Sequence, residues 1–206
     1  MPNPWLTIPL EEYEGHMSSP AVQQLSLLSE LFRCVLDRYR PESVAILGVA
    51  GGNGLEQIAP DVTTSVIAID INATYLEVVQ HRFGCLPGLQ LYCRDLDACE
   101  LCVPSAQLVH AALIFEHTGL GRPLKNALSL IAPSGVLSVI LQLPGANEQA
   151  VASTGYRSMQ SLKEVFSLID PAQFQVSVQQ EGFRLIREGN RLLPGGKGFW
   201  VGEFTQ

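Results

Sequence analysis

A glycine-rich bend between two short apolar runs constrains the fold of this chain more than any other part of its sequence. The first run, residues 43–47, is too short for a helix and leads directly into the bend, residues 48–54 (Gly-Val-Ala-Gly-Gly-Asn-Gly). The second run, residues 65–69, ends at Asp70. Apolar runs of this length, bounded by proline or glycine, are typical of strands that a parallel sheet buries on both faces.

Similar apolar runs and helical patterns alternate along the rest of the chain, which predicts an α/β fold in a single domain. Further strands are expected at residues 89–93, 108–115 and 136–143, and helices at 20–39 (with Ser19 as the N-cap), 55–59, 72–83 and 124–131. Residues 1–19 show no sustained period, so we expect them to be irregular.

The C-terminal part predicts two more helices and a hairpin. Ser161 and Glu164 form a possible capping box for a helix that carries Leu162 and Ile169 on one face. Asp170 followed by proline indicates a second helix, which ends before Gly182. Residues 183–192 and 199–204 are expected to pair as antiparallel strands through the turn at 194–196.

Composition excludes several classes of function. The 206 residues are 47% hydrophobic and carry a net charge of −7, so a surface that binds the phosphates of a nucleic acid is disfavoured. No apolar run approaches the roughly 18 residues of a membrane span, and no secretory leader is visible. Five cysteines, an odd number, indicate reduced thiols and a cytoplasmic protein, and their spacing disfavours a metal site.

The bend and Asp70 together predict a ligand site. In a doubly wound sheet a ligand packs at the carboxyl ends of the strands, where small residues allow a close approach to the backbone. A carboxylate that ends the neighbouring strand is able to accept hydrogen bonds from both hydroxyls of a ribose.

The sequence resembles the class I S-adenosylmethionine-dependent methyltransferases. The matching pieces are VAILGVAGGNG, VIAIDIN, LQLYCRDLD, LVHAALIFEH and LIAPSGVLSVILQL, followed by GFRLI and GFWVGEF, and they cover about residues 43–205. The resemblance implies a Rossmann-like sheet of seven strands, mostly parallel with an antiparallel last strand. It also implies an N-terminal lid segment and helix at 1–42, ahead of a domain at 43–206 that binds S-adenosylmethionine.

The resemblance further implies a set of cofactor-binding residues. The bend would pass beneath the methionyl and ribose portion, Asp70 would hold the ribose hydroxyls and Asp95 the adenine amino group. Two positions depart from the family pattern, because Ile46 stands where an acidic residue is frequent and Ala50 where glycine is frequent. The full implied set is Gly48, Val49, Ala50, Gly52, Gly54, Asp70, Ile71, Asp95 and Leu96.

The catalytic candidates follow from their positions. Glu116 and His117 come at the end of the fourth expected strand, where His117 is a candidate base and Glu116 is expected to orient the acceptor or the cofactor. Tyr13 and His16 belong to the segment that would cover the cofactor. We expect His110, in the middle of a strand, to be a hydrogen-bonded core residue. The loop at 144–158 and Gln142 are expected to shape the acceptor pocket.

The expected reaction is transfer of a methyl group from S-adenosylmethionine to a neutral or cationic small molecule. Two other interpretations stay open. An NAD(P)-dependent oxidoreductase also needs a glycine turn and an acidic residue, although this bend does not spell G-x-G-x-x-G and Tyr156 is followed by Gln160 rather than by lysine. A non-catalytic module that binds an adenosyl group would share the fold.

Overall fold

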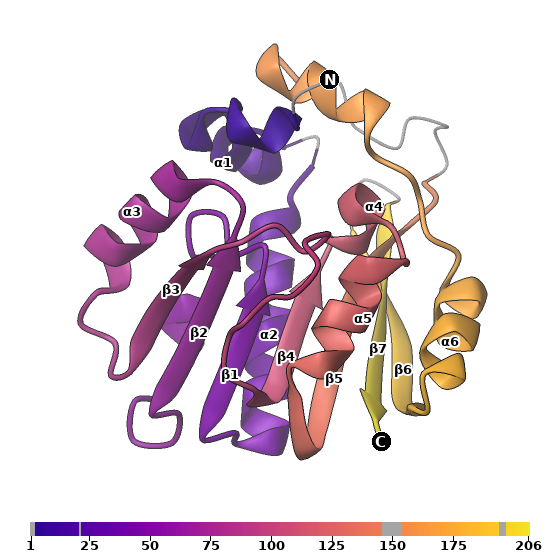
Figure 1. Cartoon of the computed structure of the whole chain (residues 1–206). Helices are drawn as coiled ribbons and strands as arrows, with labels where there is room; N and C mark the ends of the chain where they lie inside the picture. Colours follow the sequence, from indigo (N-terminus) through magenta and orange to yellow (C-terminus); the bar gives the residue numbers. More distant parts are fainter. Residues whose placement is uncertain (1–2, 21, 146–153, 194–196) are drawn as a thin grey trace.

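The computed structural model describes residues 3–20, 22–145, 154–193 and 197–206. Its centre is a seven-stranded sheet in the order β3-β2-β1-β4-β5-β7-β6 (Figure 1). Strands β1 to β5 pair in parallel, whereas β7 runs antiparallel to both β5 and β6. The strands are β1 (Ser43–Leu47), β2 (Ser65–Asp70), β3 (Leu89–Cys93), β4 (Ala106–Ala112), β5 (Ile131–Leu143), β6 (Arg184–Leu192) and β7 (Gly198–Thr205). The predicted α/β, Rossmann-like sheet is confirmed.

Helices cover both faces of the sheet because successive side chains of a strand point in opposite directions. In β1, Val44 and Ile46 pack with α2 (Gln24–Tyr39) and α3 (Ala73–Phe83), while Ala45 and Leu47 face the other core. That second core is closed by α5 (Arg122–Ser129) and α6 (Pro171–Gln180), and α5 lies in front of the sheet in Figure 1 while α2 lies behind it. The central strands β1 and β2 are therefore apolar on both faces, whereas β6, at the edge of the sheet, is mostly polar and exposed.

The N-terminal region differs from expectation. Residues 10–18, expected to be irregular, form α1 (Leu10–Ser18), which follows a short 3-10 turn, η1 (Pro4–Leu6). Only His16 and Met17 of α1 are buried, so the segment has little of the periodic pattern that marks a helix. The next helix begins at Gln24 instead of following Ser19, because Gln23 adopts a left-handed conformation with φ of 53° that a helix cannot include.

Three other expectations are wrong in detail. The expected helix at 55–59 is one 3-10 turn, η2 (Leu55–Gln57), and β4 stops at Ala112, so that the following residues form α4 (Phe115–Thr118). The expected capping box at Ser161 is absent, since residues 158–164 form a 3-10 helix, η3 (Ser158–Glu164), in which the Ser161 hydroxyl donates to the Ser158 carbonyl. The hairpin strands are confirmed, whereas the turn at 194–196 lies outside the described residues.

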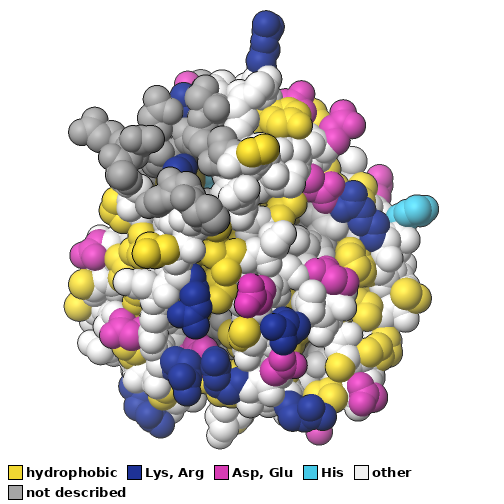
Figure 2. Space-filling view, turned by 180° about the vertical axis from the view of Figure 1, so that it is seen from behind, with side chains coloured by type: hydrophobic (Ala, Val, Ile, Leu, Met, Phe, Trp, Pro, Cys, Tyr) yellow, Lys and Arg dark blue, Asp and Glu magenta, His cyan; other side chains and the backbone are white. Residues whose placement is uncertain are grey.

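The surface agrees with the acidic composition. On the face in Figure 2, acidic side chains lie among the basic ones, so that face has no continuous basic surface. Within the described ranges, no helix has both the length and the apolar character needed to cross a bilayer. All five cysteines are free, and four of them are exposed.

Candidate functional site

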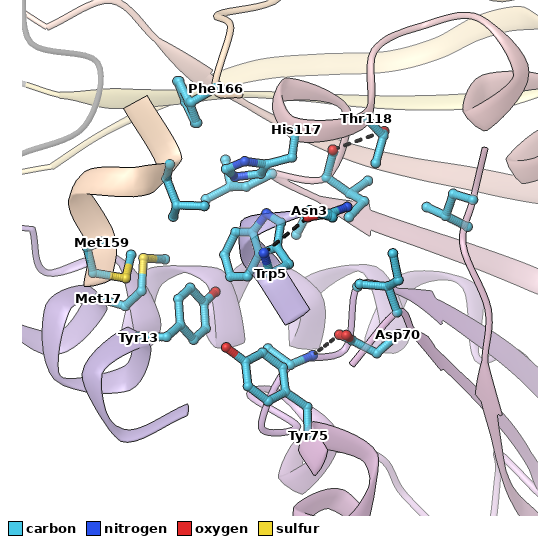
Figure 3. A pocket seen from close by; sticks show the side chains of 18 of the residues that line it. Asn3, Trp5, Tyr13, Met17, Asp70, Tyr75, His117, Thr118, Met159 and Phe166 are labelled. Atoms are coloured by element: carbon cyan, nitrogen blue, oxygen red, sulfur yellow. Dashed lines mark hydrogen bonds between the residues drawn. The ribbon is translucent and has the colours of Figure 1, made fainter. Parts of the chain in front are cut away.

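A cavity of about 130 Å³ opens at the carboxyl ends of β1, β2 and β4, beneath α1 and the N-terminal segment (Figure 3). Ten of the residues singled out from the sequence line it: Tyr13, His16, Gly48, Ala50, Asp70, Ile71, Asp95, Leu96, His117 and Gln142. The fold brings these residues together from six separate stretches of the chain.

The glycine bend forms the floor of this cavity. The backbone N–H groups of Gly48 and Val49 both donate to the Ile69 carbonyl, at 2.9 and 3.1 Å, and so tie the bend to β2. Gly48 has a φ of +69°, and a β-carbon there would lie 2.7 Å from Cδ1 of Ile114. Glycine suits this position, because a side chain would be strained at this φ and would displace the end of the Ile114 side chain.

Asp70 ends β2 and joins the bend to the cavity. One of its carboxylate oxygens accepts the Ala50 N–H and the other accepts the Asn72 N–H, each at 2.9 Å. Burial raises the pKa of Asp70, whose side chain is only 8% exposed, while the backbone N–H groups around it favour the charged form. Each oxygen keeps a second lone pair, so Asp70 is able to accept further hydrogen bonds from a ligand.

Aromatic side chains form the wall opposite the bend. The ring of Trp5 meets those of Tyr13 and His117 edge to face, with centroids 5.4 and 4.9 Å apart, and His117 meets Phe166 in the same way at 5.1 Å. Figure 3 shows these rings around one space. The amide of Asn72 donates to the Trp5 carbonyl at 2.8 Å, which fixes the N-terminal segment to the start of α3.

Burial shifts the pKa of each of three titratable groups at the cavity in the direction that favours its uncharged form. Burial lowers the pKa of His117 to about 4, and its Nδ1 has no hydrogen-bond partner among the described residues. The pKa of His16 is also lowered, by burial and then by the nearby positive charge of Lys197, and its Nδ1 lies 2.8 Å from the Thr154 hydroxyl. Burial raises the pKa of Tyr13 far above its ordinary value, so its phenol stays protonated.

Glu116, next to His117 in the chain, lines neither cavity. Its side chain is 1% exposed, one oxygen accepts the Gln142 N–H at 2.7 Å, and the other has no partner in the described part of the chain. Burial raises its pKa to about 7. Glu116 is therefore connected to the cavity through its hydrogen bond with Gln142, which does line it.

A second cavity, of about 350 Å³, lies on the other side of the bend. It shares Tyr13, Gly48, Ala50 and Ala112 with the first cavity, so the two meet at the bend. Val49 and Gly52 line this second cavity. Gly54 lines neither, because it packs against Phe32, where a β-carbon would lie 2.9 Å from the ring.

Some residues of the first cavity escaped sequence reasoning. Trp5, Met17, Tyr75, Met159 and Phe166 all line it. The proline-flanked Trp5 and the apolar residues of η3 carry no motif that would mark them.

Two other sequence expectations concern residues outside this cavity. His110 is the predicted core histidine, stacked on Phe32 and 3.1 Å from the Ser138 hydroxyl. Of the loop at 144–158, residues 146–153 lie outside the described residues, and Tyr156 packs against Gly15 rather than lining the cavity.

No model of a protein family matches the chain, and no curated protein matches it in sequence. Solved structures do match it. The N-methyltransferase NodS from Bradyrhizobium japonicum, solved with S-adenosyl-L-homocysteine, is 12% identical with a TM-score of 0.68, and the match covers 98% of this chain and 97% of NodS. A SAM-dependent methyltransferase from Leishmania major is 10% identical with a TM-score of 0.71, over 98% of this chain and 80% of that protein.

The cyclase SpnF also matches, with 12% identity and a TM-score of 0.66 over 85% of this chain and 79% of SpnF. Identities this low compare the folds alone. The seven-stranded, mostly parallel sheet with its antiparallel β7 agrees with this comparison. The chain has the fold of the class I S-adenosylmethionine-dependent methyltransferases.

Proposed function

We propose that this protein binds S-adenosylmethionine and transfers its methyl group to a small-molecule acceptor. The observation that carries the proposal is the position of Asp70 beside the glycine bend, with both facing the same cavity. The solved structure of NodS, which has the same fold, adds support, since it contains S-adenosyl-L-homocysteine.

The residues present suit this cofactor. Gly48 and Ala50 leave room above the bend, Asp70 retains acceptor capacity for two ribose hydroxyls, and Ile71 and Leu96 offer apolar surface for adenine. Asp95, which also lines the cavity, supplies an acceptor for the adenine amino group. S-adenosylmethionine supplies an activated methyl group, so the protein has mainly to position the acceptor and exclude water.

The aromatic wall performs that positioning. His117 is neutral at pH 7, so a ring nitrogen accepts a hydrogen bond from the acceptor and orients its lone pair. A pKa of about 4 makes His117 a weak base, which favours this orienting role over the storage of a proton. Tyr13, held protonated, acts as a hydrogen-bond donor, and Trp5 and Phe166 exclude water.

The test is ligand binding by calorimetry and thermal shift with S-adenosylhomocysteine and with NAD. S-adenosylhomocysteine is expected to raise the melting temperature, and NAD is not. In Asp70→Asn, loss of hydrogen bonds from two hydroxyls to a carboxylate is worth about 2 kcal/mol, a rise in Kd of about 30-fold. Asp61→Asn, at an exposed loop position, is the matched control.

Two results would contradict the proposal. Stabilisation by NAD alone would assign the site to an oxidoreductase. If S-adenosylhomocysteine binds but S-adenosylmethionine is never converted to it in the presence of pooled amine, phenol and carboxylate metabolites, the protein is a binding module instead of a transferase.

A further inference from the structure

An ion pair from two different helices lies across the glycine bend. Arg82, in the last turn of α3, donates to both carboxylate oxygens of Glu14 on α1, and the distance from its Nη2 to Glu14 Oε2 is 3.1 Å. The same guanidinium donates to the Gly51 carbonyl at 3.0 Å. The pair therefore connects the helix above the cavity to the bend below it.

The pair lies in direct contact with the backbone of the bend. A β-carbon on Gly51 would overlap the Glu14 carboxylate and lie 2.8 Å from Nη1 of Arg82. Glycine at position 51 thus allows both charged groups to reach the main chain. A ligand that follows the bend past Gly48 and Ala50 meets Glu14 and Arg82 next.

The pair also supplies charge to the second cavity. Its walls include the apolar side chains of Leu25, Leu28 and Phe32, and the carboxylates and guanidinium that line it belong to Glu14, Glu56 and Arg82. The Glu56 carboxylate already accepts the Gly54 N–H at 2.9 Å and the Ser29 hydroxyl at 2.6 Å. Glu14 and Arg82 differ from Glu56 in reaching the bend at Gly51, where Arg82 donates to the main-chain carbonyl.

We propose that Glu14 and Arg82 recognise the zwitterionic α-amino-acid end of the cofactor, with Arg82 binding its carboxylate and Glu14 its ammonium group. The inference rests on the proposed function and names residues that motif reasoning did not find. A guanidinium fork matches a carboxylate in two parallel hydrogen bonds, and a carboxylate matches an ammonium group. The zwitterion inserts between opposite charges, so neither charge of the pair is left without a counter-charge.

The test compares two ligands that differ in this end alone. S-adenosylhomocysteine carries the amino-acid group, whereas 5′-methylthioadenosine keeps the adenosine and the sulfur but lacks it. Titration calorimetry is performed on the wild type, Arg82→Met, Arg82→Lys and Glu14→Gln. Arg33→Met is the matched control, since Arg33 forms an exposed ion pair with Asp37 on α2 and lines neither cavity.

In Arg82→Met the Kd of S-adenosylhomocysteine is expected to rise tenfold or more, while that of methylthioadenosine changes less than twofold. Glu14→Gln weakens S-adenosylhomocysteine selectively as well, and Arg82→Lys has a smaller effect than Arg82→Met. Equal weakening of both ligands would mean that the pair only holds α1 in place, and an unchanged Kd for S-adenosylhomocysteine would also overturn the inference. Failure of the wild type to bind either ligand would overturn the proposed function itself.

Discussion

The buried carboxyl of Glu116 is expected to make the free energy of unfolding depend on pH. Its pKa is raised from 4.5 to about 7, so between these values the folded protein holds a proton that the unfolded chain has released. Stability therefore falls as the pH rises through this window, with a slope of about 1.4 kcal/mol per pH unit. Over the whole window the loss amounts to about 3 kcal/mol.

Glu116→Gln removes this ionisation and keeps the shape of the side chain. The variant is expected to match the wild type within about 1 kcal/mol at pH 5 and to exceed its free energy of unfolding by about 3 kcal/mol at pH 9. The gain reflects the fact that an ionised Glu116 is desolvated and receives one N–H, from Gln142, on only one of its two oxygens.

Urea denaturation at pH 5, 6, 7, 8 and 9 measures this difference. Burial lowers the pKa values of His110 and His117 to about 4, so these residues make the protein less stable as the pH falls below 6.5. They contribute equally to the wild type and to Glu116→Gln, so their contribution cancels in the difference between the two free energies of unfolding. Glu77→Gln, at an exposed position of α3, is the control and keeps the wild-type profile. Parallel curves for Glu116→Gln and the wild type would refute the reasoning.

Two further predictions concern the hydrophobic core and the contact that holds Trp5 over the cavity. Phe174→Ala, at a fully buried ring that touches Phe115, Trp200 and Phe204, is expected to lower the free energy of unfolding by about 3–5 kcal/mol in urea denaturation, and a loss below 1 kcal/mol would contradict this packing. Asn72→Ala loses a helix cap and the bond to Trp5, about 2 kcal/mol together. Asn72→Asp keeps the cap but places a carboxylate next to the Trp5 carbonyl, which repels it. Both variants are expected to make Trp5 more accessible, so acrylamide should quench its fluorescence more strongly. Unchanged quenching would show that other contacts hold Trp5.

Much of the site was predictable because local chemistry specifies it. Asn72 is an N-cap by residue type, and its side chain accepts from the Thr74 and Tyr75 N–H groups as an N-cap does. Gly48 requires a backbone conformation that other residues avoid, and Asp70 ends a β-branched run that has the length of a strand. These signals depend on neighbours within a few residues along the chain.

The errors occurred where local signals are weak. Helix α1 has only two buried residues, so its sequence lacks the apolar period that predicts a helix. Leu162, Val165, Phe166 and Ile169 have the spacing of a helix face in sequence, yet Leu162 lies in the 3-10 helix η3 and packs in a cluster with Ile8 and Met159. Glu116 was expected in the site from its position at the end of the fourth strand, but its side chain is buried and lines neither cavity.

The amino-acid sequence alone indicated the strands, the parallel type of sheet, the glycine bend and the carboxylate beside it, because apolar period, turn chemistry and capping act over a few residues, whereas the order of the strands came from the tertiary structure. Only the tertiary structure decided which side chains cover the bend. Trp5, Glu14 and Phe166 reach the site from segments far apart in sequence, and their positions depend on contacts such as Asn72 with Trp5 and Arg82 with Glu14. Contacts of this kind join residues more than 60 positions apart, and no local pattern encodes them.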